Sequence, residues 1–265
     1  MKKICLVGIG TGHPDHLTIQ AVRALAQAKA FYILEKETER NQDLVKARLE
    51  LLERHAPGKD HRVRLVRIPA RRRGGRALAD YQERVSAWRR RKAELLAAAI
   101  REDLGEGETG AILAWGDPAL YDGHIEILEE IRREGWVDFE LEVIPGITSM
   151  QVLAARHRIP LNLAGESVLV TTGRRLRELD PAGVETAVVL LDNAQSYRRL
   201  GEAELDIYWG AYLGTEDEIL VSGEARAVVD QIVQARQEAR KRKGWVMETY
   251  LLRARNAPRS QEDAP

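Results

Sequence analysis

Three glycine-containing turns carry residue types that can hold a ligand through the backbone. They are Gly8-Ile9-Gly10-Thr11-Gly12, Gly116-Asp117-Pro118 and Pro145-Gly146-Ile147-Thr148-Ser149. Glycine lets backbone N–H and C=O groups approach a bound molecule closely, and threonine or serine can cap a helix while binding a ligand. Each turn alone could be an ordinary chain reversal. Together they favour a ligand-binding site.

The spacing of the first turn argues against a dinucleotide. The usual Gly-x-Gly-x-x-Gly pattern places its third glycine one residue later than Gly12, and Pro14 falls where the helix would start. No acidic residue stands in the usual ribose-binding context. A nicotinamide oxidoreductase is therefore a weak alternative.

Metal and disulfide chemistry find no support in the sequence. No histidine or cysteine pair has recognised ligand spacing with supporting carboxylates, so we expect no metal. Cys5 is the single cysteine, which excludes an internal disulfide and fits a reducing compartment.

The overall charge gives no general attraction to nucleic acid or membranes. The 265 residues include 41 basic and 41 acidic side chains, so the formal net charge is zero and any anion site must be local. No stretch approaches the roughly 20 apolar residues that cross a bilayer. We expect a cytoplasmic protein with no membrane or nucleic-acid partner.

Short apolar runs alternate with segments of helical periodicity. The pattern predicts strands at 4–7, 31–34, 63–68, 111–115, 140–144, 168–171, 187–191, 206–212 and 245–252, and helices at 17–26, 44–55, 81–102, 125–134, 149–156 and 225–243. This alternation is typical of α/β architecture. We expect two αβα domains, 1–118 and 119–255, a ligand cleft between them, and a disordered tail at 256–265.

In order and spacing, the three turns resemble the landmarks of the tetrapyrrole (corrin/porphyrin) methylase family. The family opens with a strand and Gly-x-Gly-x-Gly-Asp-Pro followed by Leu-Thr, continues with a strand ending in Gly-Asp-Pro, and then has Val-x-Pro-Gly. His13 replaces the usual first Asp, and Glu35 replaces an Asp often found after the second strand. Segments 117–123, 155–162, 171–175 and 209–214 resemble the branch that methylates C1 of a corrin precursor and releases acetate.

The resemblance implies an S-adenosylmethionine site, no metal and a homodimer. The cofactor would lie in the cleft, held largely by backbone groups. The residues that the resemblance assigns to it are Gly10, Thr11, Trp115, Gly116, Asp117, Tyr121, Thr148, Ser149, Leu191 and Ala211.

A corrin precursor carries many carboxylates, which arginine binds in a bidentate manner. The candidates in the basic loop are Arg71, Arg72, Arg73 and Arg76, although arginine runs are commonly solvated faces. Alternatives are Arg156, Arg158, Arg174 and Arg175, while Arg89, Arg90 and Arg91 on a long helix are more typical of surface.

Acetate release implied by the resemblance would benefit from a general base. Glu35, Asp117 and His124 are the candidates, and a buried carboxylate could instead stabilise the sulfonium charge without moving protons.

Other functions fit the same motifs. A methylase of this fold could act on another tetrapyrrole position, a ribosomal RNA sugar or a modified histidine of an elongation factor, and the neutral charge argues mildly against RNA. A non-catalytic module that binds S-adenosylmethionine or a nucleotide is a further alternative.

Overall fold

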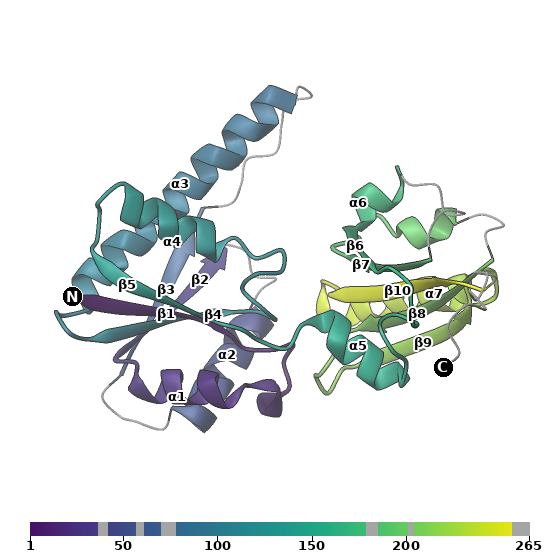
Figure 1. The fold of residues 1–265 in the computed structure, drawn as a ribbon, viewed down its shortest axis with the longest axis horizontal. Coiled ribbons are helices and arrows are strands. Elements are labelled where there is room, and N and C mark those ends of the chain that lie inside the picture. Colours follow the sequence, from purple (N-terminus) through teal and green to yellow (C-terminus); the bar gives the residue numbers. More distant parts are fainter. Residues whose placement is uncertain (37–41, 57–60, 70–77, 179–184, 201–203, 256–265) are drawn as a thin grey trace. The chain divides into compact units, whose positions relative to one another are not determined.

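The computed structural model describes residues 1–36, 42–56, 61–69, 78–178, 185–200 and 204–255. The chain divides into two compact units, Met1–Thr148 and Ser149–Pro265, each with its own sheet (Figure 1). Within the described parts of the chain, none of the helices combines the length and apolarity that a bilayer crossing requires.

The first unit is built on a parallel sheet of five strands in the order β3-β2-β4-β1-β5. The strands are β1 (Lys2–Gly8), β2 (Ala30–Lys36), β3 (Arg62–Ile68), β4 (Thr109–Ala114) and β5 (Phe139–Ile144). Because β4 and β5 pair with β1 on either side and all three run in one direction, their carboxyl ends meet at one edge. The three glycine turns follow these three ends.

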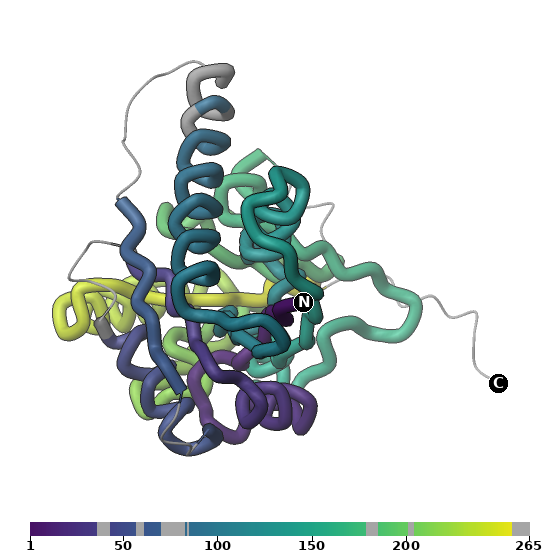
Figure 2. Tube along the Cα trace, turned by 90° about the vertical axis from the view of Figure 1, so that its left-hand side faces the viewer, coloured from purple at the N-terminus to yellow at the C-terminus, as the bar shows by residue number. Residues whose placement is uncertain are grey.

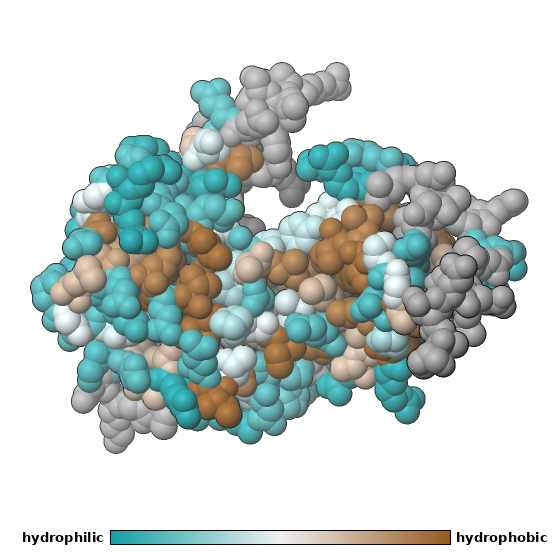
Figure 3. All heavy atoms as spheres, viewed as in Figure 1, coloured by the Kyte–Doolittle hydropathy of each residue, from teal (hydrophilic) through white to brown (hydrophobic). Residues whose placement is uncertain are grey.

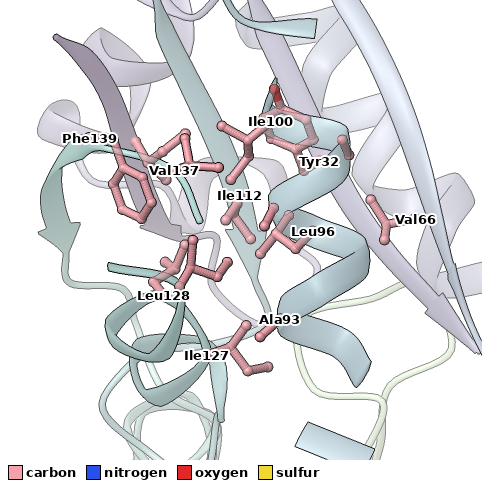
Figure 4. Packing of buried hydrophobic residues seen from close by; sticks show 14 of the residues in the cluster. Tyr32, Val66, Ala93, Leu96, Ile100, Ile112, Ile127, Leu128, Val137 and Phe139 are labelled. Carbon is pink, nitrogen blue, oxygen red and sulfur yellow. The ribbon is translucent and has the colours of Figure 1, made fainter. Parts of the chain in front are cut away.

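Helices cover both faces of this sheet. They are α1 (Ile19–Gln27), α2 (Gln42–His55), α3 (Leu78–Asp103) and α4 (His124–Arg133). Alternate strand residues point to opposite faces, so Ile112 packs with α3 and α4, while Leu113 packs with α1 and α2. Helices α3 and α4 lie side by side (Figure 2). Figure 4 shows the apolar packing between them and the sheet, with Tyr32, Leu96 and Leu128 among the labelled side chains.

The second unit contains a mixed sheet in the order β6-β7-β10-β8-β9. Its elements are α5 (Ser149–His157), β6 (Leu169–Thr172), α6 (Gly173–Leu176), β7 (Thr186–Leu190), β8 (Leu205–Ala211), β9 (Ile219–Glu224), α7 (Ala225–Lys243) and β10 (Glu248–Ala254). Only β6 and β7 pair in parallel; β10 runs antiparallel to both its neighbours.

A buried polar network ties α7 to this second sheet. Arg236 Nε donates to Glu248 Oε1 at 2.8 Å, and Trp209 Nε1 donates to Glu248 Oε2 at 3.0 Å. The arginine and the carboxylate are both buried. The ion pair therefore has its hydrogen bonds satisfied inside the second unit, as burial of charge requires.

The α/β class and all the predicted helices and strands are confirmed, with shifts of a few residues at their ends. Two features of the structure differ from the predicted organisation. The domain boundary predicted after residue 118 falls instead after Thr148, because β5 joins the first sheet beside β1. Strand β9 was not predicted, and it pairs with β8 without an intervening helix. The predicted tail, 256–265, lies outside the described residues, and the cleft stays a prediction.

Candidate functional site

The three glycine turns meet at the carboxyl edge of the first sheet. Gly116 N–H donates to Gly10 C=O at 2.7 Å, and Gly10 N–H donates to Gly116 C=O at 3.2 Å. A Cβ atom on Gly8 would lie 2.6 Å from Gly146 N and 2.9 Å from Gly116 O, so the backbones touch where side chains would stand. Gly10 and Gly116 adopt φ of 72° and 71°, which favours glycine. Close approach, not only turn formation, explains these glycines.

Asp117 fastens the second turn to the third. Its Oδ2 accepts the Gly146 N–H at 2.8 Å, and its Oδ1 accepts the Ala119 N–H at 2.7 Å. Both carboxylate oxygens of Asp117 are therefore engaged by backbone amides of the second and third turns. This geometry favours a positioning role for Asp117 over the predicted role of general base.

His124 is paired with a carboxylate at the start of α4. Asp122 Oδ1 lies 2.6 Å from His124 Nδ1 and also accepts the His124 backbone N–H at 2.8 Å. The two side chains are 17% and 16% exposed. Burial opposes ionisation of Asp122, but the hydrogen bonds from His124 outweigh it and lower the pKa of this carboxyl. The carboxylate fixes the ring through Nδ1, which leaves Nε2 as the proton acceptor.

The other predicted residues of the first unit lie around the same edge. Thr11 is buried, with its hydroxyl 3.3 Å from His16 Nδ1. Tyr121 is half-exposed at φ 52°, a strained conformation for a side chain of this size. Thr148, which ends the unit, is buried. Glu35 lies near the end of β2, and among the described residues neither a hydrogen bond nor an ion pair joins it to His124 or Asp117.

In the second unit, the predicted residues gather around the start of β10. Leu191 follows β7 and Ala211 ends β8; β10 lies between these strands, with Thr249 opposite Leu190 and Glu248 opposite Ala211. The Thr249 hydroxyl donates to Ser149 Oγ at 2.9 Å. Leu191 is 63% exposed at φ 55°. The sheet order thus brings together three residues that are far apart in sequence.

Exposed apolar side chains mark both groups. On the face drawn in Figure 3, apolar patches interrupt a mostly hydrophilic surface. The large apolar residues that are exposed include Tyr121 and Leu191. Both also have positive φ, and backbone strain in exposed residues is typical of binding sites.

The predicted arginines fall into three cases. Arg71, Arg72, Arg73 and Arg76 lie outside the described residues. Arg89, Arg90 and Arg91 are exposed on α3, as predicted. Of the alternatives in the second unit, Arg156 pairs with Glu218 at 3.0 Å and Arg175 with Glu178 at 2.8 Å, whereas Arg158 and Arg174 form no ion pair with a carboxylate of the described residues.

Comparison with known proteins decides the family. The model of the tetrapyrrole (corrin/porphyrin) methylases matches residues 3–229, which include all three glycine turns and the Asp122–His124 pair. The chain belongs to the tetrapyrrole methylases.

Relatives of this methylase include biosynthetic enzymes of the corrin pathway. It is 45% identical over 253 residues to a precorrin-6A synthase (deacetylating) of Sinorhizobium sp, which covers 96% of this chain and 95% of the relative. A solved structure of a cobalamin-synthesis-related protein (CobF) from Corynebacterium diphtheriae is 36% identical, with a TM-score of 0.80, and covers 96% of this chain and 98% of that one.

More distant structures share the fold of this methylase. A uroporphyrin-III C-methyltransferase from Thermus thermophilus, solved with S-adenosylhomocysteine, is 21% identical with a TM-score of 0.59 and covers 95% of this chain and 97% of that one. The family resemblance read from the three turns is therefore confirmed. The contacts assigned to individual residues stay predictions.

Sequence reasoning missed two polar residues of the methylase. Asp122 stands two positions before His124, a spacing that permits a loop carboxylate to turn back onto the ring. Arg48 stands four residues after Leu44 on the apolar side of α2, and its guanidinium reaches β4. A charged residue in an otherwise apolar helical stripe is a signal that the periodicity contained.

Proposed function

We propose that this tetrapyrrole methylase is a precorrin-6A synthase (deacetylating), which methylates precorrin-5 at C1 with S-adenosylmethionine and releases acetate. The observation that carries the proposal is the 45% identity to such an enzyme across 96% of this chain. The convergent glycine edge and the Asp122–His124 pair supply the backbone cradle and the base that this reaction needs.

The residues present suit S-adenosylmethionine. At the first sheet, a Cβ atom on Gly8 or Gly146 would collide with backbone atoms of the neighbouring turns, so these turns meet through main-chain groups. At the second sheet, Leu191 and Ala211 present strand ends beside Ser149. Such surfaces recognise a nucleoside through main-chain groups and small polar side chains. When bound, the cofactor supplies an electrophilic methyl group, and no metal is required.

The role of His124 follows from its hydrogen bonds. A water molecule that adds to the C1 acetyl carbonyl must lose a proton, and Nε2 of the imidazole is available while Asp122 holds Nδ1. The bond between C1 and the acetyl carbon then breaks. Acetate leaves, and the electron pair of the broken bond stays on C1. That carbon takes the methyl group. His124 then returns this proton to solvent.

Asp117 and Glu35 take other positions in this scheme. Asp117 holds the Gly116 turn against Gly146 and thereby fixes the cradle. Glu35, at the end of β2, remains the alternative base. Loss of acetate release in a His124→Gln protein, with full activity in Glu35→Gln, would assign the base to His124, and the reverse pattern would assign it to Glu35.

The function is tested by binding and by stoichiometry. Calorimetric titration should give micromolar binding of S-adenosylhomocysteine and no heat with NAD. With precorrin-5 and S-adenosylmethionine, acetate and S-adenosylhomocysteine should appear in a one-to-one ratio. Methylation without acetate would indicate another tetrapyrrole position, and binding without turnover of any tetrapyrrole would indicate a non-catalytic module.

A further inference from the structure

Arg48 is the charged residue on the apolar side of α2. Its neighbours along the helix, Leu51 and Leu52, are buried in the core beneath the first sheet. The side chain extends to the carboxyl end of β4, where Nε donates to Leu113 C=O at 3.2 Å and Nη1 donates to Leu44 C=O at 2.9 Å. The guanidinium carbon lies 5.4 Å from the centroid of the Trp115 ring. Arg48 is thus held at the strand that leads into the Gly116 turn.

The charge of this guanidinium has no direct counterion among the described residues. None of their carboxylates forms an ion pair with it, and its hydrogen bonds to the described residues come from Nε and Nη1 and not from Nη2. Burial lowers the pKa of Arg48 to about 10, and the more distant negative charge of Asp122 offsets this only in part. Buried charges in proteins are ordinarily paired, because an unpaired one is costly. Within the described part of the chain, Arg48 is therefore a partly buried cation whose guanidinium has donor capacity to spare.

Trp115 has an unused donor at the same place. Its Nε1 is buried and has no hydrogen-bond partner within the described part of the chain. An indole N–H can only donate, so it calls for an acceptor oxygen. Together the two side chains offer a positive fork and a neutral donor beside the Gly116 turn. A carboxylate satisfies both, since arginine binds its two oxygens in parallel.

We propose that Arg48 and Trp115 bind a carboxylate of the methylase's reactants at the end of β4. The carboxylate belongs either to the methionine end of S-adenosylmethionine or to an acetate or propionate side chain of the tetrapyrrole. The inference rests on the proposed function, because that function supplies both anions. It assigns a ligand contact to a residue that neither the three turns nor the basic loop indicates.

The test uses the full chain and three stable probes. S-adenosylhomocysteine carries the methionine carboxylate, 5′-methylthioadenosine has the same nucleoside without it, and uroporphyrin I carries eight carboxylates on a tetrapyrrole. Dissociation constants are measured by calorimetry and by quenching of protein fluorescence for wild type, Arg48→Gln and Arg48→Lys. Lys46→Gln is the matched control, since it removes one positive charge from the same helix at a side chain that is 76% exposed.

We expect Arg48→Gln to weaken binding of one carboxylate probe at least tenfold and to leave 5′-methylthioadenosine unchanged. A loss confined to S-adenosylhomocysteine identifies the methionine carboxylate, and a loss confined to uroporphyrin identifies the tetrapyrrole. Arg48→Lys keeps the charge but lacks the planar guanidinium, so its affinity for that probe should fall between those of wild type and Arg48→Gln. If Arg48→Gln does not fold, Arg48→Lys decides whether Arg48 binds the carboxylate. Lys46→Gln should match wild type.

Two results would overturn the proposed role of Arg48 but leave the proposed function intact. Folded Arg48 variants that bind all three probes as wild type does would reduce Arg48 to a strap between α2 and β4. Equal weakening of every probe, 5′-methylthioadenosine included, would show a distorted site. Wild-type protein that binds neither S-adenosylhomocysteine nor uroporphyrin would overturn the proposed function itself, and the carboxylate site with it.

Discussion

Gly146→Ala tests whether the three turns must touch for the site to form. A Cβ atom at this position would collide with the carbonyl oxygen of Gly116 and lie 2.8 Å from the Cα and carbonyl carbon of Gly8. The neighbours are all backbone atoms, so no side-chain rotation relieves the contact. Two strand ends of the first sheet would have to move apart.

The magnitude follows from the overlap. A separation of 2.8 Å between carbon atoms is about 0.7 Å inside the roughly 3.5 Å at which they pack, and the contact with Gly116 is closer still. Overpacking typically costs about 1–3 kcal/mol, and a purely backbone clash belongs at the upper end. For a chain of this size, about 3 kcal/mol lowers the melting temperature by roughly 6–12 °C. Displacement of the cradle by about 1 Å should also weaken S-adenosylhomocysteine binding at least tenfold.

The measurement pairs thermal unfolding, followed by circular dichroism, with calorimetric titration of S-adenosylhomocysteine. Gly105→Ala is the control: its Cβ would meet only the flexible carboxylate of Glu108, at 3.2 Å, so its stability should stay within about 1 kcal/mol of wild type. A Gly146→Ala protein with wild-type melting temperature and affinity would refute the steric argument. Reduced stability with unchanged affinity would show that the turns serve the fold and not the cofactor.

Three further changes probe the polar groups. Asp117→Asn replaces one of the two carboxylate oxygens that accept a backbone N–H with an NH2 group, which can only donate. Urea unfolding should therefore show that the free energy of unfolding falls by about 1–3 kcal/mol, and no loss would contradict the positioning role of Asp117. Asp122→Asn removes a carboxyl whose pKa is lowered by its hydrogen bonds with His124. Wild type should therefore be more stable than the variant above about pH 4, and this difference should shrink as the pH falls below the pKa of Asp122 in the folded protein. A difference that persists at pH 2 would contradict a stabilising Asp122–His124 pair. Arg236→Met leaves Glu248 buried without its cation and should lower the free energy of unfolding by about 3–5 kcal/mol. The double variant Arg236→Met with Glu248→Gln should lose less, and equal losses would show that the unpaired Glu248 charge is not the cause.

Local sequence determined the elements and the family of this methylase. The apolar runs and helical periodicities place the strands and helices because both patterns depend on neighbouring residues alone. The glycine turns could also be assigned to one edge, since parallel strands separated by helices end on the same side of a sheet. Of these glycines, the sequence nominated Gly10 and Gly116 for the cofactor site, and that assignment stays a prediction.

Strand pairing was decided only by the tertiary structure. A short edge strand such as β5 or β9 has the same residue pattern whichever neighbour it joins, so sequence could not place the boundary at Thr148 or the antiparallel pairing of the second sheet. Side-chain partners depend on the same long-range pairing. A sequence separation of 29 positions hides the hydrogen bond between Asp117 and Gly146, and a separation of 65 positions hides the contact of Arg48 with Leu113 at the end of β4. Both contacts exist because the sheet order brings separate segments together, which no local pattern encodes.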